Sequence, residues 1–288
     1  MAQRASIQPQ SVDAPLTCFA TFLVLTLQDR PATFCTVRTT LAGVEDLTKN
    51  LTIRDLHARF TCTGPTHTAP GTPGDLFFHI RAERRDLCFE FERQLLDRLG
   101  DAVTVVDETE GFRYFDMRDL LGFVDGTANP VGPAVPDAVL VTQADPAGVG
   151  GSYVVVQKYL HDLPGWRALS TEQQEAIIGR TKPDNVELAD AESGQRSHKT
   201  LATIEDDDGT EHEILRDNMP FGSPGAGEFG TYFIGYTGQL WVIERMLRRM
   251  FEGDPPGLHD RILDFSRPVT GTTFFAPSAS VLAQLDDQ

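Results

Sequence analysis

The sequence contains little cysteine, with four residues among 288, and all four fall in the first third of the chain. No two of them form a Cys-x-x-Cys pair, which argues against a zinc site or an iron–sulfur cluster held by thiolates. Cys18 and Cys88 lie in apolar segments and are expected to be core thiols. Cysteine therefore does not indicate the chemistry of this protein.

Long apolar segments and an excess of basic residues are also missing. No apolar run approaches the roughly 20 residues of a membrane-spanning helix. The first ten residues contain neither an apolar leader core nor a twin arginine. The formal net charge of −17 argues against binding to nucleic-acid phosphates and favours cationic or neutral small substrates over anionic ones. These absences predict a cytoplasmic protein that binds neither membrane nor nucleic acid.

The first part of the chain has the pattern of an α+β unit. Apolar, β-branched runs predict strands over 18–27 and 75–82. A helix is expected after each strand, over 32–50 and 84–99 respectively, and two strands, 102–106 and 112–115, are expected to flank an acidic turn. In the second helix one apolar stripe is expected, formed by Leu87, Cys88, Phe91, Leu95 and Leu99. This order of elements fits a ferredoxin-like unit with an antiparallel sheet and helices on its outside.

The pattern restarts after a segment rich in proline and glycine. We expect a strand over 152–160, a helix that begins with a capping box at Ser170, and a helix over 240–251. The expected strands of this part are 152–160, 213–216, 230–236 and 270–275. The sequence thus predicts a duplicated fold with three parts: residues 1–121, 122–150 and 151–288. The second unit is longer because it contains a polar insertion over 182–199, which includes His198.

One stretch, Gly122-Phe-Val-Asp-Gly-Thr-Ala-Asn-Pro130, places Asp125 between two glycines and behind a bulky apolar pair. Glycines allow tight turns and a close approach of the backbone to a ligand. A carboxyl against an apolar wall is a candidate acid–base group with a raised pKa. The alternative is that Asp-Gly followed by Asn-Pro marks a turn and nothing more.

Two later segments contain further candidate residues: Ser197-His198, and Leu215-Arg-Asp-Asn-Met-Pro-Phe-Gly222. Together with Gly-Phe-Val-Asp-Gly, and in the same order, they resemble the dye-decolourising peroxidases, most closely the compact bacterial B-type. The resemblance extends from about residue 7 to 277. It implies two ferredoxin-like halves, with haem b (iron protoporphyrin IX) in the C-terminal half. It also implies reduction of hydrogen peroxide and oxidation of dyes, phenols or other small aromatic reductants through a ferryl intermediate.

The resemblance assigns a role to each candidate site residue. His198 is expected to be the axial ligand of the iron, with Asp260 on its other ring nitrogen, and Arg180 is expected to bind a haem propionate. In the same way, Asp125 would move the peroxide proton. Arg216 would stabilise negative charge on the peroxide oxygen, and Asn218 would hydrogen-bond the peroxide or a water molecule.

Simpler interpretations stay open beside these roles. A lone histidine in a loop is more often solvated than bound to metal. Arg216 could form a structural ion pair with Asp217 or another carboxylate. The same pocket could store haem or release its iron, so a haem-handling protein is the alternative function. B-type relatives are often cargo of a protein shell, through a C-terminal tail that is absent here, so shell loading is not expected. Whether the chain forms a homo-oligomer is open.

Overall fold

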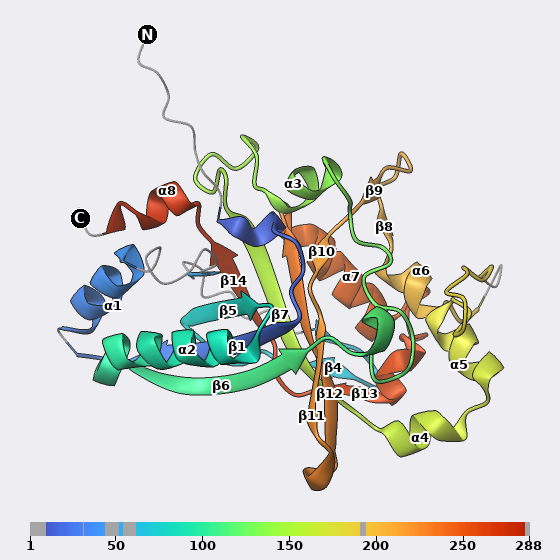
Figure 1. Ribbon diagram of the computed structural model, residues 1–288. Coiled ribbons are helices and arrows are strands. Elements are labelled where there is room, and N and C mark those ends of the chain that lie inside the picture. The colour runs from blue at the N-terminus through green and yellow to red at the C-terminus, as the bar shows by residue number, and fades with distance from the viewer. Residues whose placement is uncertain (1–9, 31, 44–51, 54–61, 191–193, 286–288) are drawn as a thin grey trace.

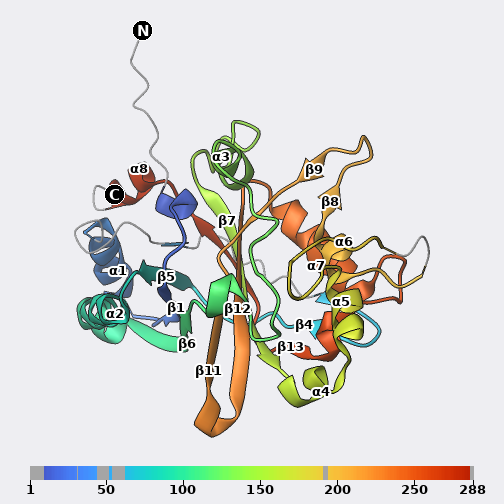
Figure 2. The same cartoon turned by 45° about the vertical axis from the view of Figure 1, so that its right-hand side comes forward.

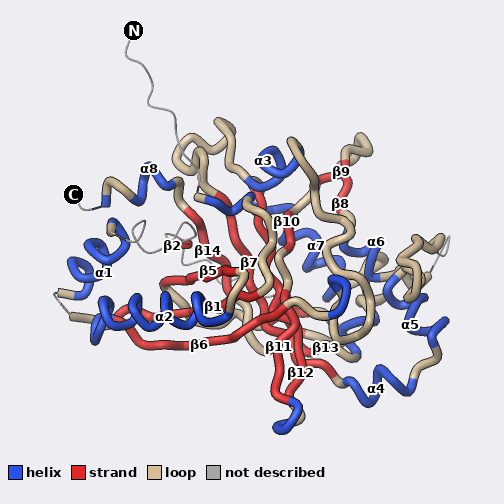
Figure 3. Tube along the Cα trace, viewed as in Figure 1, coloured by secondary structure: helices blue, strands red, loops and turns tan. Residues whose placement is uncertain are grey.

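The computed structural model of the protein describes residues 10–30, 32–43, 52–53, 62–190 and 194–285 (Figure 1). Strands occupy the centre of the molecule and helices lie mainly at its outside, as Figure 3 shows. Among the described residues, no helix is both long enough and apolar enough to cross a membrane.

The first sheet is antiparallel and has four strands in the order β2-β5-β1-β6. Their bounds are β1 Phe19–Leu27, β2 Thr52–Ile53, β5 Leu76–Ala82 and β6 Val103–Phe112. Helices α1 (Thr33–Ala42) and α2 (Arg85–Leu99) follow β1 and β5, and the unit therefore has the β-α-β-β-α-β order of a ferredoxin-like fold. The apolar stripe of α2 packs on the outer face of this sheet, with α1 and the short C-terminal α8 (Ala279–Leu282).

The second sheet is centred on β7 (Ser152–His161) and β12 (Glu228–Thr237), in the order β10-β12-β7-β13. Strand β11 also pairs with β12, and β14 also pairs with β7. The bounds are β10 Leu215–Arg216, β11 Met219–Ser223, β13 Ser266–Pro268 and β14 Thr272–Ala276. Helices α6 (His198–Ala202) and α7 (Leu240–Glu252) pack on its outer face.

Short elements complete the fold. Two small antiparallel pairs are β3 with β4 and β8 with β9. The bounds are β3 Cys62–Thr63, β4 Thr68–Ala69, β8 Ile204–Glu205, β9 Glu211–His212, α3 Ala134–Val139, α4 Leu163–Ala168 and α5 Thr171–Ile178. Helix α5 has the predicted capping box, because Ser170 Oγ accepts from Gln173 N and Gln173 Oε1 accepts from Ser170 N.

The inner faces of the two sheets share one apolar core. It joins Phe22, Val24 and Phe77 of the first sheet to Val154, Tyr232, Ile234 and Phe274 of the second. Helices α1 and α2 lie on one side of the two sheets and α7 lies on the other (Figures 1 and 2). The layers are therefore helix, sheet, sheet and helix, and the α+β fold class predicted from the sequence is confirmed.

Four details of the sequence prediction were wrong or incomplete. Cys18 is exposed and is not a core thiol, whereas Cys88 is buried as expected. The acidic residues near position 108 do not form a turn but lie within β6, an edge strand on which Glu108 and Glu110 point to solvent. Leu87 is 53% exposed and does not belong to the stripe of α2. The first helix ends at Ala42, and residues 44–50 of the expected helix lie outside the described part of the chain.

Candidate active site

A cavity with about 890 Å³ of empty space, partly open to solvent, lies between the second sheet, helices α6 and α7, and the Gly122–Pro130 stretch. Its polar lining includes Asp125, His198, Arg216 and Asn218. Its apolar lining includes Ile178, Phe233, Met246, Leu247, Met250 and Ile262. A pocket with apolar walls and a few convergent polar groups is typical of a cofactor or small-molecule site.

The Gly122–Pro130 stretch is a turn, as its composition predicted, and it also presents a carboxyl group to the cavity. Gly122 and Gly126 have φ angles of +94° and +75°, which L side chains rarely adopt. Asp125 Oδ1 accepts a hydrogen bond from Gly126 N at 2.7 Å and one from Asn218 Nδ2 at 3.4 Å. Burial raises the pKa of Asp125, although these hydrogen bonds and the positive charge of Arg216 oppose the rise.

Asn129 joins this turn to strand β10. Its Oδ1 accepts from Arg216 N at 2.9 Å, and its Nδ2 donates to Arg216 O at 2.7 Å. Arg216 and Asn218 are two positions apart, and both side chains line the cavity. Asn218 Oδ1 also accepts a hydrogen bond from Ile234 N at 3.1 Å. This bond fixes the side-chain amide so that its Nδ2 faces Asp125.

Arg216 carries a positive charge into the cavity wall without a neutralising ion pair. Its Nη2 lies 3.5 Å from both the Ala202 carbonyl oxygen and Met246 Sδ, and no carboxylate of the described residues lies within 4.0 Å of its guanidinium. Burial lowers the pKa of Arg216, and the nearby charge of Asp125 opposes this effect. The alternative of an ion pair with Asp217 is wrong, because Asp217 binds Arg81 and Arg113 on the opposite side of the chain.

His198 is the first residue of α6, which Ser197 caps through Thr200 N. Its Nδ1 lies 2.7 Å from Asp260 Oδ2, and Asp260 is completely buried. About a third of the His198 side chain (32%) is accessible, because the ring lines the cavity. Burial disfavours the imidazolium, but the charge and hydrogen bond of Asp260 outweigh burial, and the pKa of His198 is raised.

Arg180 lies beside the site but has partners within its own loop. Its Nη1 donates to Asn185 O at 3.1 Å, and its Nη2 is paired with Glu187. It lines a second cavity that shares Asp125, His198 and Arg216 with the first one. The six site residues predicted from the sequence are thus close together: four line the main cavity, Asp260 supports His198 from behind, and Arg180 lines the adjoining cavity.

Sequence reasoning missed other polar groups of the cavity. Gln157, Tyr159 and His161 occupy alternate positions of β7 and all line it. The ring nitrogens of His161 lie 2.8 Å from Ser266 Oγ and 2.9 Å from Thr231 Oγ1, and burial lowers its pKa to about 4. Asp119 lines the same cavity, and burial raises its pKa to about 7. The period-two placement of polar residues in an otherwise apolar strand was the signal that could have revealed the first three.

The donor set fits an iron porphyrin. The Nδ1 atom of His198 is held by a buried carboxylate, and no hydrogen bond joins Nε2 to any residue that the structure describes. A carboxylate that fixes one nitrogen of a histidine raises the basicity of the other, which is the common arrangement of a metal-bound imidazole. The apolar lining suits a flat hydrophobic ring, and the cation and carboxyl group are suited to a polar reactant.

A cavity that contains a carboxylate-bound imidazole, an arginine and a buried carboxyl group fits one class of haem enzyme, the peroxidases. Comparison with protein families gives the more specific assignment. Residues 116–281 match the family model "Dyp-type peroxidase, C-terminal", and residues 51–113 match "Dyp-type peroxidase, N-terminal". The chain belongs to the Dyp-type peroxidase family.

Individual relatives agree with this assignment. The chain is 49% identical to a dye-decolorizing peroxidase of Mycobacterium tuberculosis, over 96% of this chain and 90% of the relative. It is 50% identical to DyPB from Rhodococcus jostii RHA1, with a TM-score of 0.92, over 97% of this chain and 99% of that one. The encapsulated DyP-type peroxidase from Mycobacterium smegmatis is 46% identical, with a TM-score of 0.91 and 98% of each chain covered. Several of the Rhodococcus structures are complexes with heme.

Proposed function

We propose that this protein is a haem b peroxidase that reduces hydrogen peroxide and oxidises dyes, phenols or other small aromatic compounds. The observation that carries the proposal is the His198–Asp260 pair at the wall of a cavity that also contains Arg216 and Asp125. Family membership and the haem complexes of the similar Rhodococcus protein support it.

The residues that would hold the cofactor follow from the geometry. His198 would bind iron through Nε2, and Asp260 would fix the ring and increase its basicity. Arg180 would bind a propionate, in competition with its contact to Glu187. Bound haem would supply the redox chemistry, which no side chain of the cavity can supply by itself.

The remaining cavity residues would act on the peroxide. Asp125, when ionised, would take a proton from hydrogen peroxide and return it to the leaving oxygen. Arg216 would stabilise the negative charge that develops on oxygen as the O–O bond breaks, because it forms no ion pair with a carboxylate of the described residues. Asn218 would orient Asp125 through the hydrogen bond between their side chains.

Replacing His198 with alanine tests the assignment of the ligand. We expect the purified His198→Ala protein to lose haem or to hold it weakly, measured as the ratio of Soret to protein absorbance and as the rate of haem transfer to apomyoglobin. His79→Ala is the matched control, because His79 is buried between the sheets and does not line the cavity. This control should be less stable but should retain haem, and a normal haem spectrum in the His198 variant would show that another residue binds the iron.

The alternative of a haem-handling protein is separated by a different measurement. Both proteins would bind haem, but only a peroxidase oxidises a dye over many turnovers when peroxide is added. Release of protoporphyrin or iron from bound haem, without turnover of a dye, would favour haem handling.

Several finer proposals accompany this function. We propose the division into 1–121, 122–150 and 151–288, which is supported by the location of the two sheets within 19–112 and 152–276. The cytoplasmic location and the identity of the reductant remain predictions. The expectation against loading into a protein shell also remains a prediction, although the similar Mycobacterium smegmatis enzyme is encapsulated. Co-expression with a shell protein, followed by native electrophoresis, would test it, and light scattering would give the oligomeric state.

A further inference from the structure

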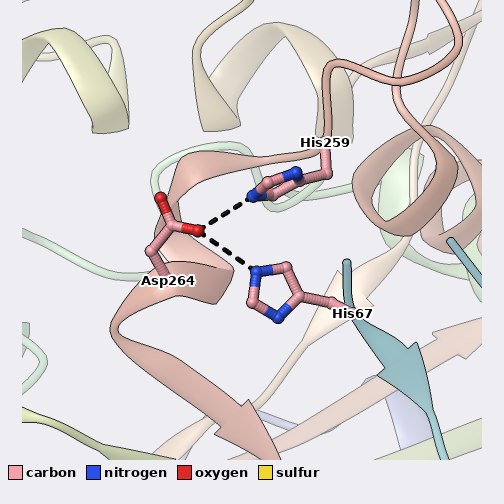
Figure 4. Close-up of side chains that lie close together, drawn as sticks. All are labelled: His67, His259 and Asp264. Atoms are coloured by element: carbon pink, nitrogen blue, oxygen red, sulfur yellow. Dashed lines mark hydrogen bonds and ion pairs between the residues drawn. The ribbon is translucent and has the colours of Figure 1, made fainter. Parts of the chain in front are cut away.

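A second cluster of potential metal ligands lies outside the cavity and is formed by His67, His259 and Asp264 (Figure 4). His67 comes from the hairpin between β3 and β4, where the backbone of Gly64 donates to the carbonyl of His67. His259 and Asp264 come from the segment between α7 and β13. His67 and Asp264 are 197 positions apart in the sequence.

The three side chains converge on one point. His67 Nε2 lies 3.1 Å from Asp264 Oδ1, and His259 Nε2 lies 2.9 Å from the same oxygen. One ligand atom from each residue lies within 4.8 Å of the other two. Two ligands at about 2.0–2.1 Å from one ion are about 2.8–3.4 Å apart in octahedral or tetrahedral geometry. The two histidine–aspartate separations lie in this range, and the two imidazole nitrogens lie within 4.8 Å of each other.

The surroundings of the cluster orient its ligands and also limit its affinity for a cation. The side chains are only 16–28% exposed, so the ligands are partly shielded from bulk water. Arg261 Nε donates to Asp264 Oδ2 at 2.5 Å, which orients the carboxylate with Oδ1 toward the two imidazoles. This arginine also places a positive charge beside the site, which weakens binding of an ion.

We propose that His67, His259 and Asp264 bind one divalent transition-metal ion of the zinc class, with water in the remaining position. Two imidazoles and one carboxylate suit Zn²⁺ and similar ions, whereas Mg²⁺ and Ca²⁺ prefer oxygen ligands alone. Each imidazole would bind through Nε2 in its neutral form with the proton on Nδ1. The two hydrogen bonds to Asp264 would be replaced by bonds to the ion, and the ligand protons would move to Nδ1 or to solvent.

The position of the site gives the ion a structural consequence. It would connect the β3–β4 hairpin of the first half to the segment that contains Asp260, which directly follows His259. Asp260 caps the short helix Arg261–Asp264 through Ile262 N, and its other oxygen holds His198. An ion at this site would therefore restrict the segment that supports His198, without contacting the haem cavity.

The test is calorimetric titration of untagged, haem-loaded protein with Zn²⁺, and separately with Mg²⁺. We expect one Zn²⁺ per chain and no comparable binding of Mg²⁺. Loss of a supporting outer-shell partner typically weakens metal binding 10–100-fold, and loss of a direct ligand should therefore cost at least about 100-fold. His67→Gln and His259→Gln are the variants, and both keep a polar side chain at the position.

His212→Gln is the matched control. His212 Nε2 lies 2.5 Å from Asp206 Oδ2, and no second histidine in the described part of the chain is close enough to share an ion with this pair. Its Zn²⁺ affinity should equal that of the unmodified protein. Zinc K-edge X-ray absorption of the unmodified complex should show two imidazole ligands, a readout that does not depend on folding of the variants. The proposal is overturned if no ion binds, if His67→Gln and His259→Gln bind Zn²⁺ as well as the unmodified protein, or if absorption shows no imidazole.

Discussion

At the scale of single residues, the cavity combines Asp125, a carboxyl group of raised pKa, with Arg216, which forms no ion pair with a described carboxylate. Their contributions can be ranked. A general acid–base group is typically worth ~10²–10⁴-fold in rate, and one fixed donor at a developing negative charge is worth ~10²–10³-fold. These ranges overlap, so the ranking depends on which group water can replace. Gly126 N and Asn218 Nδ2 would still be present to hold a water molecule in place of the Asp125 carboxylate.

We therefore predict that Arg216→Leu slows the reaction with peroxide more than Asp125→Ala, because water can relay a proton but cannot replace a buried cation. The measurement is stopped-flow absorbance in the Soret region after the ferric protein is mixed with peroxide, at equal haem occupancy. No described carboxylate loses an ion pair when Arg216 is removed, so haem retention should change little. If the Asp125 variant is slower by tenfold or more, the carboxylate is the dominant group and the ranking is wrong.

The second prediction at this scale concerns pH. Burial raises the pKa of Asp125, and the ionised form is the one that accepts a proton. The rate should therefore be highest above this raised pKa and should fall as the pH decreases through it. Asp125→Asn should remove this dependence, measured by the same stopped-flow experiment across pH 4–8, a range about the ordinary and raised values of an Asp carboxyl.

Asp119 is the alternative source of this pH dependence, because it lines the same cavity and burial raises its pKa to about 7. Asp119→Asn is consequently the control and should retain the fall in rate at low pH. If the dependence disappears in the Asp119 variant and persists in the Asp125 variant, Asp119 is the titrating group.

At the scale of elements, the Gly122–Pro130 turn and strand β10 form the site only because Asn129 joins them. Replacing Asn129 with alanine leaves Arg216 N and O without these partners, at a cost of about 1–3 kcal/mol in the free energy of unfolding. We predict a slower reaction with peroxide than in the unmodified protein, but a faster one than in Arg216→Leu, because the charge remains. Chemical denaturation and the stopped-flow rate measure the two effects.

The control for this element lies two residues earlier in the same turn. Thr127 is exposed, and Thr127→Ala should change neither stability nor rate. Asn129→Asp can accept from Arg216 N but cannot donate to Arg216 O, so its stability should lie between those of the other two proteins. An unchanged stability and rate in Asn129→Ala would show that β12 alone positions Arg216.

The sequence predicted the helices and strands better than it predicted the contacts between residues far apart in the chain. Strands β1, β5, β7 and β12 and helices α2 and α7 were predicted within a few residues, because apolar periodicity is local information. The acidic residues of β6 were misread as a turn, since only the sheet order shows that β6 is an edge strand. The hydrogen bonds between Asn129 and Arg216 join residues 87 positions apart, so no local sequence pattern indicates them. Likewise, the resemblance, and not periodicity, indicated His198 and Asp260.

At the scale of the whole molecule, the two sheets do not have separate cores on their inner faces. Phe22 of β1 stacks on Tyr232 of β12, with ring centroids 4.1 Å apart and planes inclined by 12°, and on His79 of β5 at 4.8 Å. All three residues are almost completely buried. The cavity with His198 and Arg216 lies on the opposite face of the second sheet, so the shared core packs against the other side of the strands that line it.

The last prediction follows from this shared core. Phe22→Ala should lower the free energy of unfolding by about 3–5 kcal/mol, the usual cost of removing a buried aromatic ring. Because the lost contacts belong to both sheets, both halves should unfold together at a lower denaturant concentration. Soret absorbance, which reports on the second half, and far-UV circular dichroism, which reports on both, should give coincident transitions. Phe89→Ala is the matched control, since this ring is 61% exposed on α2, and surface changes usually stay within about 0.5 kcal/mol. If circular dichroism shows an earlier transition while the Soret band is unchanged, the first half unfolds by itself and the sheets are not one cooperative unit.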